Sequence, residues 1–145
     1  MSVKRRLFQG ALLPALTYAC ETWCLTGRLE NKLAVAQRKW ERKMLGVTLL
    51  DRRTNVWVRN KTGLMDVVEH CRERRFCWVE RIAGLDHERW ARAVLEWHPR
   101  GPIRRKGRPV RRWRDDFVKA VGTEFLRMAA EKKEEWSRAK TLQTQ

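Results

Sequence analysis

The chain has 145 residues, 43% of them hydrophobic, so it can form one domain with a buried core and lacks the composition of a disordered protein. Its 33 Lys and Arg against 17 Asp and Glu give a net charge of +16, which makes nucleic acid the first expected partner and an anionic membrane surface the second. We find no segment of about 18 uninterrupted apolar residues and no clear signal-peptide cleavage site, so we expect neither a membrane span nor export.

The first predicted element is a helix over residues 3–25, where apolar side chains recur at steps of three and four. Pro14 lies inside this stripe. Because proline lacks an N–H group and clashes with the preceding turn, we expect a kink or break near Leu13. A second helix is predicted over residues 28–45, with its apolar side chains on one face and most of its cations elsewhere.

Three further helices are predicted in the middle of the chain. Thr54 is a suitable cap for a short helix over residues 55–61, and a long helix is expected over residues 66–84. Asp86 is a candidate cap for the next, over residues 87–97. The Gly- and Pro-rich, strongly basic composition begins only after these helices, beyond residue 97.

Residues 99–108 read as a linker, because they combine prolines, glycines and a run of positive charge. Beyond it we expect a C-terminal helical segment over residues 109–141, with Pro109 in its first turn. No stretch alternates convincingly with the period of a strand. The sequence thus predicts an all-α, irregular helical bundle of about five to seven helices, divided into a helical region over residues 3–98, the basic Gly/Pro linker and the C-terminal segment.

Asp115 and Asp116 raise the question of a catalytic metal-binding pair. Neighbouring residues on a helix project about 100° apart, so the two carboxylates do not easily converge on one metal ion. Negative charge in the first turns of a helix suits the helix dipole and can pair with Arg111, Arg112 or a distant arginine. We therefore predict a structural role for the two aspartates and no catalytic residue.

The strongest functional signal is a basic arm. From Arg100 to Arg114, eight of fifteen residues are Lys or Arg and none is acidic. The tetrapeptide from Lys106 to Pro109 also resembles the core of an AT-hook, which lies in a narrow minor groove, although a solvated linker is the plainer interpretation. The candidate nucleic-acid-binding residues lie on the second predicted helix and in the arm: Arg38, Arg42, Lys43, Arg104, Arg105, Lys106, Arg108, Arg111 and Arg112.

The four cysteines and eight tryptophans are interpreted as structural. The pairs Cys20/Cys24 and Cys71/Cys77 fall on predicted helices, at spacings unlike those of a zinc knuckle, so we expect buried reduced thiols, no metal and no cofactor. Tryptophans can stack on unpaired bases. At helical spacing beside leucines they are more often core residues, and we expect that role for at least six of the eight.

Three blocks in this order carry a resemblance to a known family: LPALTYACETWCLT (13–26), QRKWERKMLG (37–46) and ERWARAVLEWHPRG followed by GRPVRRWRDD (88–116). They resemble the C-terminal part, the thumb and the region beyond it, of LINE-type non-LTR retrotransposon endonuclease-reverse transcriptases. The similarity extends from about Val3 to Trp136. The chain departs from the pattern after Trp78, where similar sequences carry a Gly-His pair and this one has Glu80-Arg81.

The resemblance implies a thumb-like helical region that grips RNA template and nascent DNA, with the catalytic aspartates of the family in a polymerase palm upstream. We therefore expect a noncatalytic fragment that binds RNA or DNA through phosphates, without a small-molecule substrate, intracellular and nuclear if expressed. Two alternatives remain open. One is an interaction module whose basic surface binds an acidic protein or an anionic membrane, and the other is a fragment that is active only with a separate palm.

Overall fold

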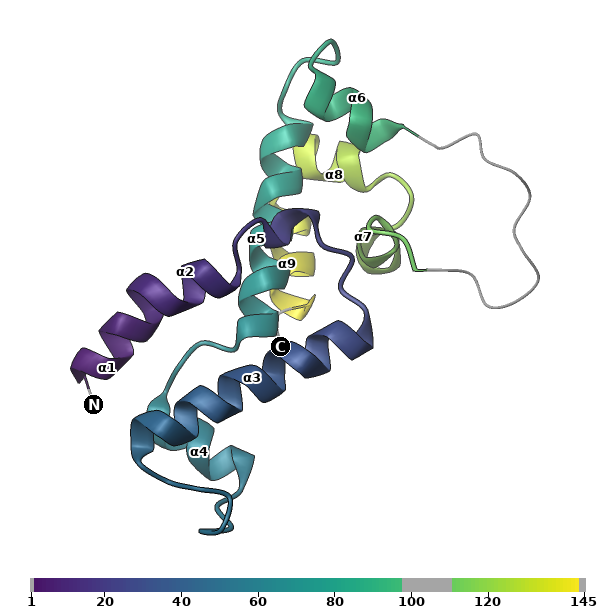
Figure 1. The fold of residues 1–145 in the computed structure, drawn as a ribbon. Coiled ribbons are helices and arrows are strands. Elements are labelled where there is room, and N and C mark those ends of the chain that lie inside the picture. The colour runs from purple at the N-terminus through teal and green to yellow at the C-terminus, as the bar shows by residue number, and fades with distance from the viewer. Residues whose placement is uncertain (1, 98–110, 144–145) are drawn as a thin grey trace. The chain divides into compact units, whose positions relative to one another are not determined.

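A computed structural model describes residues 2–97 and 111–143, and within them all regular structure is helical, as predicted (Figure 1). The elements in chain order are α1 (Ser2–Leu7), a π-helical turn (Phe8–Leu12), α2 (Leu13–Leu16), a 3-10 turn (Cys20–Thr22), α3 (Gly27–Leu45), α4 (Asn55–Thr62), α5 (Val67–Ala83), α6 (Trp90–Glu96), α7 (Asp115–Val121), α8 (Phe125–Glu131) and α9 (Lys133–Gln143). The chain divides into two units, residues 1–72 and 73–145, at a boundary inside α5. The predicted linker over residues 99–108 lies outside the described residues.

The first helix shows how the chain accommodates Pro14. The proline ring would clash with the carbonyl of Gly10 in a regular α-helix. The backbone widens into a π-helix just before it, where the Leu13 N–H bonds to the Phe8 carbonyl. A π-turn is a known way to absorb such an interruption, so the predicted irregularity near Leu13 is confirmed.

The prediction that this helix continues to Leu25 is wrong, because it ends at Leu16. The Thr17 hydroxyl donates to the Leu13 carbonyl at 2.8 Å, and Ala19 adopts a left-handed conformation with φ of 55°. This reversal brings Cys20 and Leu25 into the core, where both are fully buried. Burial of apolar side chains thus decides where the helix stops, and the local pattern does not reveal it.

The next two helices begin and end as their sequences predict. Thr26 caps α3 by accepting a hydrogen bond from Leu29 N, and Thr54 caps α4 in the same way. Gly46 ends α3 with φ of 70°, a left-handed conformation that glycine adopts without strain. The predicted ranges of 28–45 and 55–61 agree with the observed helices to within one residue.

The later helices differ more from the prediction. Asp86 does not cap α6, which begins only at Trp90. The C-terminal region forms three helices, because the chain breaks at Gly122, with φ of 93°, and again at Lys132, with ψ of 63°. Pro109, the predicted first-turn residue, lies outside the described residues.

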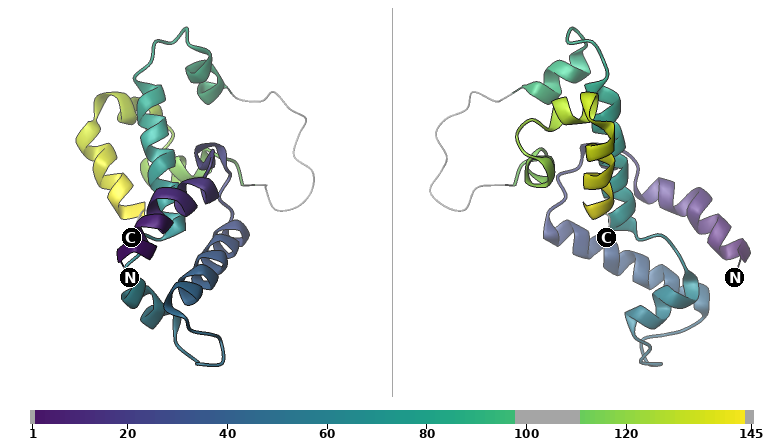
Figure 2. Two further views of the ribbon diagram at one scale, coloured as in Figure 1. Left: turned by 60° about the vertical axis from the view of Figure 1, so that its left-hand side comes forward. Right: turned by 180° about the vertical axis from the view of Figure 1, so that it is seen from behind.

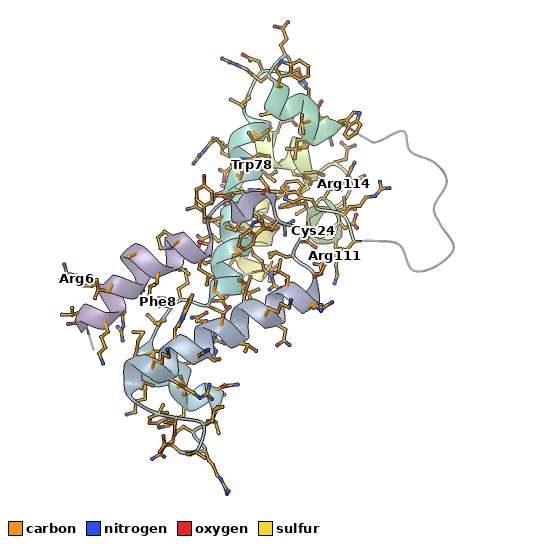
Figure 3. The ribbon with its side chains drawn as sticks, viewed as in Figure 1. Arg6, Phe8, Cys24, Trp78, Arg111 and Arg114 are labelled. Atoms are coloured by element: carbon orange, nitrogen blue, oxygen red, sulfur yellow. The ribbon has the colours of Figure 1, made fainter. Side chains whose placement is uncertain are left out.

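Residues 1–72 have a core of their own, formed by Phe8, Leu13, Cys20, Leu25, Leu33, Leu64, Val67 and Cys71. The Phe8 ring, labelled in Figure 3, meets the ring of Trp40 edge to face at a centroid distance of 6.2 Å. Gln37 is fully buried and joins α3 to the start of α5. Its amide donates to the Met65 carbonyl at 2.8 Å, and its oxygen accepts from Val67 N at 2.7 Å.

Residues 73–145 have a second core, built mainly from aromatic rings. Phe76 of α5 lies 5.0 Å from Phe117 of α7 and 4.9 Å from Trp136 of α9, and Phe125 of α8 stacks on Phe117 at 5.5 Å. Figures 1 and 2 show α9 beside α5 in every view. Such ring pairs stabilise a core beyond their buried area.

Fewer tryptophans are core residues than predicted. Five of them belong to the two cores or pack against them: Trp23, Trp40, Trp78, Trp113 and Trp136. Trp57 is half-buried, and the Arg53 guanidinium lies 5.1 Å from the centre of its ring. Trp90 and Trp97 are exposed by 84% and 65%. The expectation of six core tryptophans is therefore too high.

Candidate nucleic-acid interface

Arg38, the first candidate on α3, is buried. Its side chain is only 10% exposed, and the guanidinium pairs with Glu41 and, at 3.0 Å, with Asp66. Asp66 also pairs with Arg59 at 3.1 Å. The charge of Arg38 is therefore paired inside the first unit, where it links α3 to the start of α5, and its binding to nucleic acid stays a prediction.

The two neighbouring candidates on α3 differ from each other. Arg42 is partly buried and donates to Asn55 Oδ1 at 2.7 Å and to the Arg53 carbonyl at 3.3 Å, so it holds the loop before α4. Lys43 is exposed, and no hydrogen bond or ion pair joins it to the described residues. Of the three α3 residues that the sequence suggested, only Lys43 has a free cationic side chain.

The structure adds three other cations of α3 to Lys43. Arg28, Lys32, Lys39 and Lys43 are all exposed, and within the described residues none of their side chains has a hydrogen-bond or ion-pair partner. With about 100° of rotation per residue, their spacing of four, seven and four places them within about 60° of one another around the helix. We call these four residues the α3 cation row.

The α3 cation row lies opposite the buried face of its helix. Leu33, Gln37 and Glu41 are buried, and their positions are centred about 150° around the axis from the row. From Arg28 to Lys43 the row extends about 22 Å at 1.5 Å per residue. Four unpaired cations along this length match a polyanion with regularly repeating charges.

The acidic side chains of residues 1–72 are largely engaged elsewhere. This unit carries 14 Lys and Arg against 6 Asp and Glu, a net charge of +8. Glu30 pairs with Arg72 at 2.9 Å, and Glu41 and Asp66 hold Arg38. Asp51 accepts hydrogen bonds from the Thr48 backbone and hydroxyl, which lower the pKa of its carboxyl below 3.8. These contacts keep four of the six carboxylates paired away from the α3 cation row.

The second unit carries the end of the basic arm. Arg111, which precedes α7 by four residues and is labelled in Figure 3, pairs with Asp116 and so has a partner inside the molecule. Arg112 is exposed, and its side chain has no partner among the residues described. Four of the predicted binding residues, Arg104, Arg105, Lys106 and Arg108, lie outside the described residues.

The two aspartates have the structural role that the sequence predicts. Asp115 begins α7 and accepts a hydrogen bond from Arg112 N at 2.7 Å. Asp116 binds the Arg75 guanidinium at 2.5 Å as well as Arg111. The two carboxylates face different partners, and Arg75, which is 41 residues away in the chain, is the distant arginine that the sequence could not identify.

The four cysteines form no disulfide. Among residues 2–97 and 111–143, no three His, Cys, Asp or Glu side chains are grouped so as to hold a metal ion. Lys140 donates to Cys77 Sγ at 3.1 Å and pairs with Glu73 at 3.3 Å. Burial opposes the charge of Lys140, but its contacts with Cys77 and Glu73 outweigh this effect and raise its pKa. Lys140 is thus a cation bound inside its own unit.

A search of the described helices finds none with the length and apolar character needed to cross a membrane. No family model matches the sequence. No solved structure matches it either.

One similar protein gives an indication of origin. The chain is 29% identical over 125 residues to a Caenorhabditis elegans protein described as transposon-derived. The alignment covers 83% of this chain and 45% of that protein, so the chain spans less than half the length of its relative. This similarity supports a transposon-derived origin for the chain.

Proposed function

We propose that this chain is a noncatalytic C-terminal fragment of a LINE-type non-LTR retrotransposon reverse transcriptase and that it binds the phosphate backbone of nucleic acid. The three sequence blocks that resemble such enzymes support the family, and the transposon-derived relative supports the coarser origin. RNA and DNA duplexes are both candidate ligands, because contacts with phosphates depend on charge and not on base identity.

The observation that carries the proposal is the α3 cation row. Arg28, Lys32, Lys39 and Lys43 leave their charges unpaired on the face of α3 opposite its core. Exposed cations without carboxylate partners repel one another, and a polyanion removes that repulsion while it releases its own counterions. Lys and Arg aligned along one helix face are the usual electrostatic mark of a nucleic-acid-binding protein.

The same proposal assigns no catalytic activity to this chain. Asp115 and Asp116 are engaged at the start of α7 and with Arg75, so we assign them a structural role. The polymerase aspartates of the family belong to its palm. A nuclear, intracellular location would bring the chain to its proposed ligand.

The test replaces the whole α3 cation row with glutamine: Arg28→Gln, Lys32→Gln, Lys39→Gln and Lys43→Gln. Glutamine has nearly the helix propensity of lysine and arginine, so α3 is retained while four charges are removed. At about 0.1 M salt we expect affinity for a 20-base-pair RNA–DNA hybrid and for a DNA duplex to fall by more than about tenfold. Fluorescence anisotropy of the end-labelled duplexes measures both affinities.

A matched control removes four exposed cations from the other unit: Arg81→Gln, Lys119→Gln, Lys133→Gln and Arg138→Gln. It makes the same change in net charge, so a ligand that responds only to net charge is weakened equally by both variants. We expect the control to lose less than about threefold. Equal losses, or stronger binding of the wild type to anionic vesicles than to either duplex, would contradict the proposal.

A further inference from the structure

Helix α6 has an apolar side that the described residues of its own unit leave exposed. Within this helix no residue is fully buried. Trp90 is 84% exposed, Val94 65% and Trp97 65%. Because they are four and three positions apart, these side chains lie on one side of the helix, within about 60° of one another. This side displays two of the eight indole rings of the chain.

The opposite side of α6 is fixed to the end of α5. Arg92, two residues after Trp90 and therefore about 160° around the axis, is 14% exposed. Its guanidinium donates to the Ala83 carbonyl at 2.6 Å and to the Leu85 carbonyl at 2.9 Å. It also pairs with Glu96 at 2.9 Å. These bonds hold α6 with its tryptophan side directed away from its attachment.

The charge around this helix favours a polyanion over an apolar protein groove. Residues 73–145 carry 19 Lys and Arg against 11 Asp and Glu, a net charge of +8. The sequence that begins three residues after Trp97 has eight Lys and Arg among fifteen residues and no acidic residue. The sequence next to Trp97 is therefore strongly cationic, which favours a polyanion as the ligand.

The chemistry of the exposed side chains then selects the form of nucleic acid. An indole face stacks on any base, but in a duplex the base faces are already stacked on one another. We propose that Trp90 and Trp97 form a stacking platform for unpaired bases, so that residues 73–145 bind single-stranded nucleic acid. This inference rests on the proposed function, and it names a ligand class that the α3 cation row does not distinguish.

The experiment uses the full chain and the double variant Trp90→Ala and Trp97→Ala. The ligands are 12-nucleotide oligo(dT) and oligo(rU) and a 20-base-pair DNA duplex, each with a fluorescent label. Loss of base–aromatic stacking should weaken single-strand binding by at least about tenfold, while duplex affinity changes by less than about twofold. Val94→Ser removes the apolar side chain between the indoles and, as the matched control, should change neither affinity by more than about twofold.

A direct readout accompanies the affinities. Oligonucleotides carrying 5-bromouridine should cross-link to the wild-type chain on irradiation, and the modified peptide should contain Trp90 or Trp97. Cross-links that map only elsewhere would refute the platform, as would single-strand binding by the double variant within twofold of the wild type. A wild-type dimer that the double variant dissociates would also refute it, because this side would then face a second copy.

The outcomes distinguish a failure of the stacking platform from a failure of the proposed function. If the wild type binds duplex and single strand, and the double variant binds both equally well, the stacking platform is wrong and the proposed function stands. If the wild type binds neither ligand, both are wrong. Circular dichroism should be unchanged in all variants, because the substituted side chains are exposed.

Discussion

Arg75 is a buried cation that joins α5 to the start of α7 in the second unit. Its guanidinium is 2% exposed, donates to Asp116 at 2.5 Å and to the Trp113 carbonyl at 2.7 Å, and lies 5.1 Å from the centre of the Phe117 ring. Replacing it with methionine leaves the partly buried Asp116 with only the more exposed Arg111. We expect Arg75→Met to lower the free energy of unfolding by about 3 kcal/mol, measured by urea denaturation and circular dichroism.

Arg112 provides the control for the substitution of Arg75. It carries the same charge, lies three residues before α7 and is exposed, with no side-chain partner among the described residues. Arg112→Met should change the free energy of unfolding by less than about 0.5 kcal/mol. Similar losses in the two variants would show that net charge, and not the buried contacts of Arg75, governs the stability of this unit.

At the scale of elements, the caps are the features that can be tested one at a time. The Thr54 hydroxyl accepts a hydrogen bond from Trp57 N at 3.2 Å and thereby begins α4. Thr54→Ala should lower the free energy of unfolding by about 1 kcal/mol, whereas Thr54→Ser retains the hydroxyl and should cost much less. Urea denaturation of the two variants measures the difference. If serine is as unfavourable as alanine, the cap contributes nothing to stability.

The elements also show what a sequence can and cannot predict. The bounds of α3 and α4 were predicted to within a residue, and the structure shows Thr26, Gly46 and Thr54 as the caps at three of these ends. Leu16, where the first helix ends, carries no such signal, because the reversal serves to bury Cys20 and Leu25 in a core formed by distant segments. Helical period predicted the type of structure throughout, but not the place where tertiary contacts interrupt it.

The candidate interface could be predicted only in part, because helical period is visible in the sequence whereas contacts between distant residues are not. The α3 cation row follows from the helical period alone, since its four residues repeat opposite the apolar face. The pairing of Arg38 could not be predicted, because its partner Asp66 lies 28 residues away in the chain and such pairs cannot be read from spacing. Glu41, three residues after Arg38, was the only local indication that this charge is satisfied internally.

For the whole molecule, the net charge divides equally: residues 1–72 and residues 73–145 each carry +8. Among the residues that the structure describes, the first unit displays a row of unpaired cations and the second displays exposed tryptophans on one helix side. We therefore propose that the first unit binds duplex phosphates and that the second binds unpaired bases. Each assignment can fail without the other.

The salt dependence of duplex binding tests the central claim most directly. If the α3 cation row neutralises four phosphates, log affinity against log salt concentration should have a slope of about −3.6 or steeper, at about 0.9 per contact. In the four-glutamine variant that slope should become shallower by about 3 to 4, while the control variant of the other unit keeps the wild-type value. A wild-type slope near zero, or one that the substitution of Arg28, Lys32, Lys39 and Lys43 leaves unchanged, would contradict the account.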